Sequence, residues 1–165
     1  MITLKSALLA TAVAALASTA AHAATDTAQF NVKLEITSSC TIGATAADDV
    51  DFGSHASTET NLTADGQLNV NCTPGTGYVI SLDDGLNSAG GGVTARKMAN
   101  GANLVPYQLY SDPARSNVWG SMSGTNTVGG TGTGAAEAIP VYGQADSANF
   151  PAGTYSDVVI ATITY

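Results

Sequence analysis

The chain has 165 residues and a net charge of −8 at neutral pH, with 18 glycines and only 11% charged residues. This length suits one domain with its own core and leaves little room for two. The negative charge makes nucleic acid and anionic membrane surfaces poor partners, because like charges repel.

Residues 1–23 have the layout of a secretory signal peptide. Lys5 supplies a positive charge near the start, and a run of small apolar residues follows at 7–17. Small residues also stand at the positions that a signal peptidase reads, so we predict cleavage after Ala23. No later segment approaches a membrane span, and we expect an exported protein with no direct membrane span.

A regular alternation follows the leader at Thr27–Thr37. Its apolar residues are separated by single polar ones; they are Ala28, Phe30, Val32, Leu34 and Ile36. In an extended strand, a period of two places all of these side chains on one face. Such a strand is either the first strand of its own domain or a portable strand that completes another domain. The residues by themselves leave both interpretations open.

The chain has two cysteines, Cys40 and Cys72. In an exported protein an even pair is typical of a disulfide. A catalytic thiol or a metal site lacks partners, because His55 is the one histidine after the leader and no CxxC spacing occurs. We therefore predict a structural disulfide, which would stabilise the fold by roughly 3–4 kcal/mol on the chain-entropy model.

Short strands separated by turns are predicted along the rest of the chain, and no segment has a helical period. The candidate strands are Gln67–Asn71, Tyr78–Leu82, Tyr107–Tyr110, Ile139–Gly143 and Val158–Tyr165. Glycine-rich clusters at 87–92 and 120–134 predict turns, the second being a long mobile loop inside one domain. This arrangement favours an all-β antiparallel sandwich.

The last candidate strand is largely apolar on both faces. One face carries Val159, Ala161, Ile163 and Tyr165. The other carries Val158, Ile160, Thr162 and Thr164. This segment is either simply the last strand of a sandwich or an edge at which a partner binds.

Motifs that would indicate catalysis or a metal site are weak. Three acidic residues come close together at Asp48, Asp49 and Asp51. Their spacing matches no EF-hand loop, and a solvated acidic loop is the simpler interpretation. The glycines of 130–134 open no βαβ unit, as a phosphate-binding loop would. Trp119 is expected to pack in the core or a loop, and His55 to be a lone surface histidine. We expect no enzymatic activity, cofactor or metal.

Several short motifs follow the leader and the alternating strand. They are Ser39–Gly43, Phe52–Gly53, Leu68–Cys72, Tyr107–Arg115, Ile139–Gly143, and Gly153–Asp157 with the final strand. In this order and spacing they resemble the spore coat protein U domain family, which includes the pilin subunits of archaic chaperone–usher pili. The resemblance covers essentially the whole chain after the leader, apart from the glycine-rich insert near Gly129.

The resemblance implies an immunoglobulin-like antiparallel β-sandwich at 39–165 that lacks its last, seventh strand and keeps an apolar groove open. It implies that residues 24–38 are a donor-strand extension for the groove of a neighbouring subunit. The matching donor positions are Ala28, Phe30, Val32, Leu34 and Ile36. The positions that would border the groove are Val159, Ala161, Ile163 and Tyr165. Cys40 and Cys72 match the cysteine pair of the family.

The partners that the resemblance implies are a periplasmic chaperone, an outer-membrane usher, and identical or related pilin subunits. The expected function is a structural subunit of a surface fibre that supports adhesion or biofilm formation. The expected location is the periplasm in transit and then the cell surface. Three alternatives stay open: a spore-coat or outer-layer protein, a single-domain secreted adhesin or binding module, and, least favoured, a small secreted enzyme.

Overall fold

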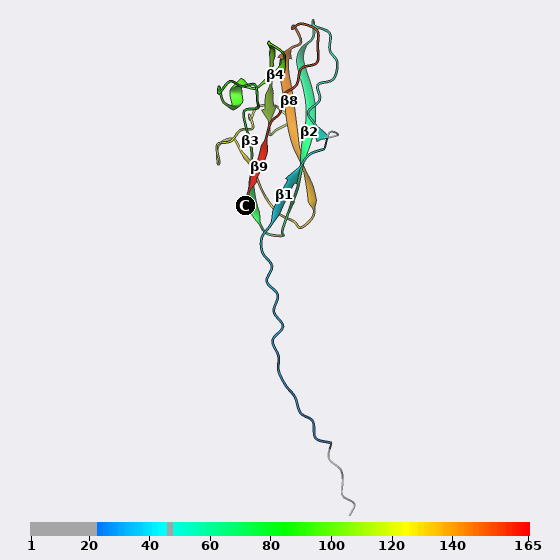
Figure 1. The fold of residues 1–165 in the computed structure, drawn as a ribbon, viewed down its shortest axis with the longest axis vertical. Helices are drawn as coiled ribbons and strands as arrows, with labels where there is room; N and C mark the ends of the chain where they lie inside the picture. The colour runs from blue at the N-terminus through cyan, green and yellow to red at the C-terminus, as the bar shows by residue number, and fades with distance from the viewer. Residues whose placement is uncertain (1–22, 46–47) are drawn as a thin grey trace, which may run out of the picture. The chain divides into compact units, whose positions relative to one another are not determined.

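The computed structural model describes residues 23–45 and 48–165 (Figure 1). The chain divides into two units, Met1–Glu35 and Ile36–Tyr165, and the strands formed by the described residues lie in the second. The predicted leader, apart from Ala23, lies outside the described residues. Within the described part, no helix has the length and apolar character needed to cross a membrane.

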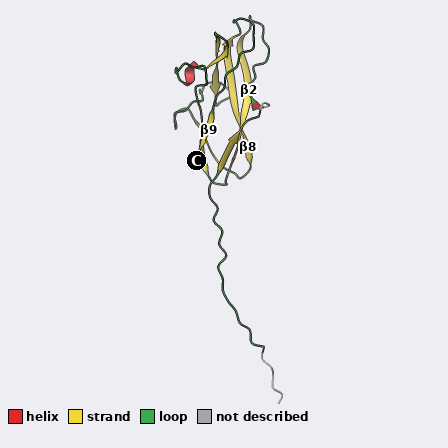
Figure 2. Ribbon diagram, in the orientation of Figure 1, coloured by secondary structure: helices red, strands yellow, loops and turns green. Residues whose placement is uncertain are grey.

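The regular secondary structure of the second unit is almost entirely antiparallel strand, joined by long loops (Figure 2). In chain order they are β1 (Cys40–Gly43), β2 (Thr60–Cys72), β3 (Gly77–Leu82), β4 (Lys97–Asn100), β5 (Asn103–Pro106), β6 (Gln108–Tyr110), β7 (Val128–Thr131), β8 (Ala136–Ser147) and β9 (Ala161–Thr164). A 3-10 turn, η2 (Val93–Ala95), precedes β4. The predicted all-β antiparallel fold is confirmed.

Three sheets make up this unit. The largest has the order β1-β2-β8-β6, the second has the order β7-β3-β9, and β4 and β5 form a separate hairpin. The long strands β2 and β8 form the central ladder, in which Leu62 lies opposite Ala145 and Gly66 opposite Val141. Alternation along these strands turns Leu62, Val141 and Ala145 into the core.

The centre of the core lies between the two larger sheets. Trp119 and Ile80 are completely buried there. The indole Nε1 of Trp119 donates a hydrogen bond of 3.0 Å to the carbonyl oxygen of Ile80, so its one polar atom is satisfied. The expectation that Trp119 is a packing residue is confirmed.

The prediction of a continuous mobile loop at 120–134 is wrong. Residues 128–131 form β7, which pairs with β3 along Tyr78–Ile80. Glycine is required in this strand, because a Cβ atom on Gly130 would collide with the ring of Tyr78. Here glycine marks the close approach of an aromatic side chain to the backbone, a role that composition alone does not distinguish from a loop.

Five predicted strands correspond to β2, β3, β6, β8 and β9, whereas β1, β4, β5 and β7 were not predicted. Strand β9 begins later than predicted, at Ala161. Immediately before it, the carbonyl oxygen of Ile160 accepts from the amide of Asp83, beyond the end of β3. Residues 27–37 take part in none of the ladders formed by the described residues. A strand exists only with a hydrogen-bonding partner, so alternation alone does not create one.

Candidate functional site: an open edge between two sheets

Strands β1 and β9 each end a sheet. Strand β1 pairs only with β2, and β9 pairs only with β3. The two strands belong to different sheets but lie next to each other on one side of the sandwich (Figure 1). Two sheet edges therefore face each other there, and neither has a partner strand among residues 36–45 and 48–165. Edges of this kind are templates for an added strand.

The first edge extends beyond β9 and is here called the edge segment, Tyr155–Ile163. Every second side chain of it is half-buried: Tyr155, Asp157, Val159, Ala161 and Ile163. The intervening residues are exposed. Val159, Ala161 and Ile163 pack against the core, as expected for an inward face. Tyr165, predicted on the same face, is 58% exposed.

Along the edge segment, the backbone amide and carbonyl groups of every second residue point away from β3 and have no ladder partner among the described residues. The amide and the carbonyl of Ile160 both bond to Asp83, on the β3 side. In an antiparallel strand these groups alternate in direction, so those of Val159, Ala161 and Ile163 point toward the unpaired side. The residues with inward side chains are thus also the ones that can extend the ladder.

The opposite side is here called the facing rim, and it consists of Cys40, Ile42, Val50 and Phe52. These residues are half-buried and pack against the same core. The amide and carbonyl of Ser39 both bond to Thr73, so the backbone groups of Cys40 and Ile42 point toward the open side. The predicted disulfide is confirmed: Cys40 is bonded to Cys72, the residue directly opposite it on β2.

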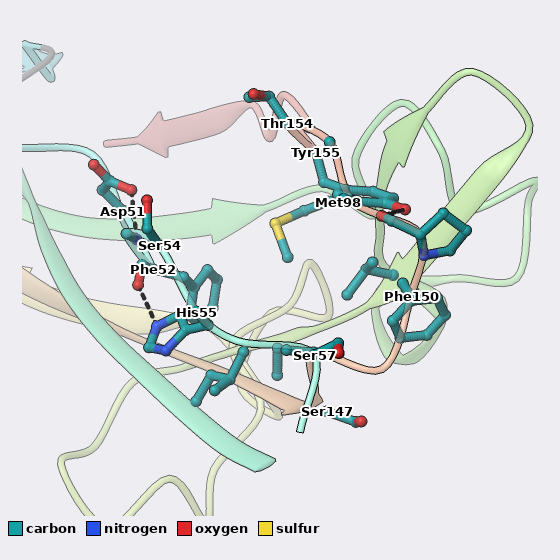
Figure 3. A pocket seen from close by; sticks show the side chains of 18 of the residues that line it. Asp51, Phe52, Ser54, His55, Ser57, Met98, Ser147, Phe150, Thr154 and Tyr155 are labelled. Carbon is teal, nitrogen blue, oxygen red and sulfur yellow. Dashed lines mark hydrogen bonds between the residues drawn. The ribbon is translucent and has the colours of Figure 1, made fainter. Parts of the chain in front are cut away.

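A cavity of about 690 Å³ lies at the end of this region where the edge segment begins. Phe52 of the facing rim and Tyr155 of the edge segment both line it. Figure 3 shows Phe52 and His55 on one side, with Met98, Phe150 and Tyr155 across from them. The cavity wall therefore combines these apolar and aromatic side chains with polar groups, and Phe52, Met98 and Phe150 are the contacts it offers to an apolar side chain.

His55 is held by two acceptors at the cavity. Its Nδ1 lies 2.7 Å from a carboxylate oxygen of Glu59, and its Nε2 lies 2.6 Å from the carbonyl oxygen of Phe52. Only the doubly protonated imidazolium can donate to both. The hydrogen bond to Glu59, then that to Phe52, raises the pKa of His55, and the same contact lowers the pKa of Glu59. His55 is exposed, as expected, but it is not isolated, because it pairs with Glu59 and lines the cavity.

Asp157 fixes the start of the edge segment. Its carboxylate accepts hydrogen bonds from the hydroxyl of Tyr107 at 2.7 Å, the amide of Leu86 at 3.0 Å and the side-chain amide of Asn87 at 2.8 Å. Nearby, Arg96 is fully buried and donates to the carbonyl oxygen of Asp83. These polar contacts connect the edge segment to the loop after β3.

Sequence reasoning missed Tyr107, Arg96 and Asp157 as a group. They are far apart in the chain, and the main acceptors of Arg96 are backbone carbonyl groups. A backbone carbonyl group can belong to any residue type, so these hydrogen bonds leave no recognisable pattern in the sequence. The strongest available signal was the motif match at Gly153–Asp157, which ends on the carboxylate that Tyr107 binds.

The interpretation of Asp48 as part of a solvated loop needs correction. Asp48 is half-buried as a residue, and its carboxylate accepts from the amide and hydroxyl of Thr45 and from the side chains of Gln67 and Asn69 on β2. These bonds, led by that from the Thr45 amide, lower the pKa of Asp48. Asp48 thereby anchors the segment that leads to Val50. In the described ranges, no cluster of metal-ligand residues occurs.

The predicted donor positions belong to a part of the chain with strongly exposed apolar residues. Phe30, Val32 and Leu34 are each about 85% exposed, and Ala28 and Ile36 are exposed as well. A contiguous row of large exposed apolar side chains is unusual in a soluble protein and marks an interaction segment. No described strand pairs with it.

Among solved structures, the chain is similar to a chain in the CsuC–CsuE chaperone–tip adhesion subunit pre-assembly complex, from archaic chaperone–usher Csu pili of Acinetobacter baumannii. The TM-score is 0.60 at 22% sequence identity. The match covers 79% of this chain and 40% of that chain. This likeness concerns the fold, and it agrees with the sandwich described above.

Two sequence comparisons identify the family. The chain is 37% identical over 158 residues to Protein U of Myxococcus xanthus, covering 88% of each protein. The profile of the Spore Coat Protein U domain matches residues 26–162. The chain therefore belongs to the spore coat protein U domain family.

Proposed function

We propose that this protein is a structural subunit of a chaperone–usher surface fibre. In this proposal, one copy inserts residues 28–36, here called the donor segment, between the edge segment and the facing rim of the next copy. The observation that carries the proposal is the pair of unpaired sheet edges, whose inward side chains are apolar apart from Asp157 and whose backbone groups point toward the open side.

The dimensions of donor and acceptor support this assignment. The donor segment has nine residues with five apolar side chains on one face, and the edge segment has nine residues with five inward side chains. At roughly 3.3 Å per residue, each covers about 30 Å when extended. An added strand would form ladder bonds with β9 on one side and β1 on the other, while its alternate side chains enter the core. Insertion requires the two edges to separate where their Cα atoms come within 8 Å, because two ladder spacings span about 9.6 Å.

The exposed side chains of the donor segment supply the driving force. Burial of a large apolar side chain contributes roughly 1.5–3 kcal/mol, so Phe30, Val32, Leu34 and Ile36 together contribute on the order of 10 kcal/mol before ordering costs. Donation from one copy to the next is heterologous, because donor and acceptor are different surfaces. Such a contact does not close on itself, and repetition produces a filament.

The proposal also accounts for the partners. An open apolar edge is an aggregation hazard, so a strand from a periplasmic chaperone would cover it in transit. The proposed route is export through the signal peptide, handover at an outer-membrane usher and assembly at the cell surface, where a role in adhesion or biofilm formation follows. Assembly by strand exchange assigns no catalytic residue and uses no cofactor in this chain.

A second candidate is a coat or outer-layer protein, which the family description favours. It would use the same strand exchange in a different assembly. Neighbouring genes separate the two candidates, since a fibre requires a chaperone gene and an usher gene beside this one.

The test is a detergent-resistant ladder of oligomers formed by the purified mature protein after removal of its chaperone. Deletion of residues 25–37 should abolish the ladder and leave a chaperone-bound monomer. A matched pair sharpens the test: Val32→Asp should abolish the ladder, whereas Asn31→Asp, on the opposite face, should retain it. An unchanged ladder after deletion would contradict the proposal.

A further inference from the structure

We infer that the donor segment lies antiparallel to the edge segment, in the register that places Phe30 of one copy directly opposite Ala161 of the next. This inference rests on the proposed function and specifies which residue of the edge segment faces each residue of the donor segment. It names one residue pair as the determinant of register.

The two rows have complementary sizes in this register. Along the edge segment, Ala161 is the one small inward side chain, and it lies between Val159 and Ile163. Along the donor segment, Ala28 is the small side chain and Phe30 is the largest. The antiparallel register pairs Ala28 with Ile163 and Phe30 with Ala161, so the largest donor side chain faces the smallest inward side chain of the edge segment.

Because paired side chains lie directly opposite each other, their sizes determine which register fits. Side chains that lie opposite each other in an antiparallel pair share a face, with Cβ atoms about 5 Å apart. The edge segment also packs against a closed core, since Ala161 and Ile163 contact buried residues. A phenyl ring therefore fits best where the opposite residue contributes only a methyl group.

The residues at the other end of the donor segment also fit the antiparallel register. The antiparallel arrangement brings Ile36 opposite Tyr155, where the cavity of about 690 Å³ lies. A parallel arrangement would bring Ala28 to that cavity and would place Ile36 opposite Ile163. It would thus put the smallest donor side chain at the cavity and Ile36 at the end of the edge segment away from it.

Shifts by two residues keep every side chain on its face, so alternation cannot exclude them. One shift places Phe30 opposite Ile163, and the other places it opposite Val159. Both put two large side chains in one position. Asp157 does not select among these arrangements, because its carboxylate is already engaged by Tyr107, Leu86 and Asn87. Ala161 is therefore the residue that sets the register.

The first experiment is a size-exchange series in the full mature chain, read by the detergent-resistant ladder. Ala161→Phe should reduce ladder formation by about tenfold or more, because the opposite position is then overfilled. Adding Phe30→Ala to the same chain should restore the ladder. Adding Val32→Ala or Leu34→Ala should not restore it.

Each outcome is decisive. Rescue by Val32→Ala would indicate a two-residue shift, and rescue by Leu34→Ala would indicate a parallel donor; either overturns the inference. An Ala161→Phe chain that polymerises normally also overturns it. If the unmodified chain forms no ladder at all, the proposed function fails instead, which keeps the two failures separate.

A second measurement avoids any loss of folding. A diazirine analogue of leucine at position 163 is nearly the size of isoleucine and can be activated in the intact polymer. The cross-link should map to Ala28 of the neighbouring copy. A cross-link to Phe30 would indicate the shifted register, and one to Ile36 would indicate the parallel orientation; both contradict the inference.

Discussion

Tyr107 and Asp157 are joined by a hydrogen bond in which the tyrosine hydroxyl donates to the carboxylate at 2.7 Å. Tyr107 is buried at the junction of β5 and β6, whereas Asp157 lies on the edge segment. Burial, followed by the bond to Asp157, raises the pKa of Tyr107 well above its ordinary value, so the hydroxyl keeps its proton. The proposed acceptor edge is thus attached to the core by a bond that persists over the physiological pH range.

Tyr107→Phe removes this donor and leaves a half-buried carboxylate with one bond fewer. We expect the free energy of unfolding to fall by about 1.5–3 kcal/mol, since hydrogen bonds to charged groups contribute about this much. Guanidinium unfolding followed by the fluorescence of Trp119, the one tryptophan, measures the change. Tyr110→Phe on β6 is the control, because it removes the same hydroxyl from a half-buried tyrosine that is not the partner of Asp157. Equal effects of the two variants would contradict the assigned role.

The double variant Cys40→Ser/Cys72→Ser tests the attachment of the facing rim. The disulfide closes a sequence separation of 32 residues and fixes the short edge strand β1 to β2. We expect a loss of roughly 3–4 kcal/mol on the chain-entropy model. Unfolding experiments should show this loss in the variant and, for the unmodified protein, after reduction. A loss below about 1 kcal/mol would show that β1 holds its place without the bond.

The contact between His55 and Glu59 should stabilise the fold only within a limited pH range. The pKa of His55 is raised from 6.5, so its contribution to stability is fully present below pH 6.5 and is lost as the pH rises through the folded-state value. The pKa of Glu59 is lowered from 4.5, so its contribution is present above pH 4.5 and is lost on acidification. The contact should therefore be strongest between pH 4.5 and 6.5.

An NMR titration checks this prediction directly, because cleavage of the leader would leave His55 as the one histidine. The measured pKa should exceed 6.5 and should fall in the variant Glu59→Gln. His55→Gln should weaken the loss of stability above neutral pH. A pKa at or below the ordinary histidine value would show that the two acceptors do not hold the imidazolium in solution.

Gly130→Ala tests why an edge strand is rich in glycine. The added methyl group would collide with the ring of Tyr78, so we expect a destabilisation of about 1–3 kcal/mol. Gly77→Ala at the start of β3 is the matched control, because a Cβ atom there meets nothing within 4 Å. Its effect should stay within about 0.5 kcal/mol. Similar losses in both variants would point to a general cost of replacing glycine in this sheet.

The parts of the fold that could be predicted from sequence are those in which alternating side chains report burial. Tyr78–Leu82 and Ile139–Gly143 are such segments, and they lie in β3 and β8. Strands β4 and β5 escaped prediction because they are four residues long and form a hairpin that is partly exposed. The strand β7 escaped because its glycines make room for Tyr78 and carry no alternation of their own.

The acceptor could be predicted only in part. Alternation identified the inward residues Val159, Ala161 and Ile163, since their pattern lies within one segment. The facing rim could not be found in this way, because Ile42 and Phe52 are separated by a connecting segment that Asp48 holds in place. The cavity is assembled from still more distant segments, including Phe52, Met98 and Tyr155. Contacts between segments far apart in the chain leave no local pattern.

Residue-resolved amide exchange at the edge segment is the most direct test of the central proposal. The amide of Ala161 points to the open side, whereas that of Thr162 points toward β3, so the two neighbours serve as probe and internal reference. In the polymer, exchange at Ala161 should slow to the rate at Thr162. In a monomer that lacks residues 25–37, Ala161 should exchange rapidly while Thr162 stays protected. If the Ala161 amide were equally protected in the monomer and in the polymer, no strand would be missing at this edge.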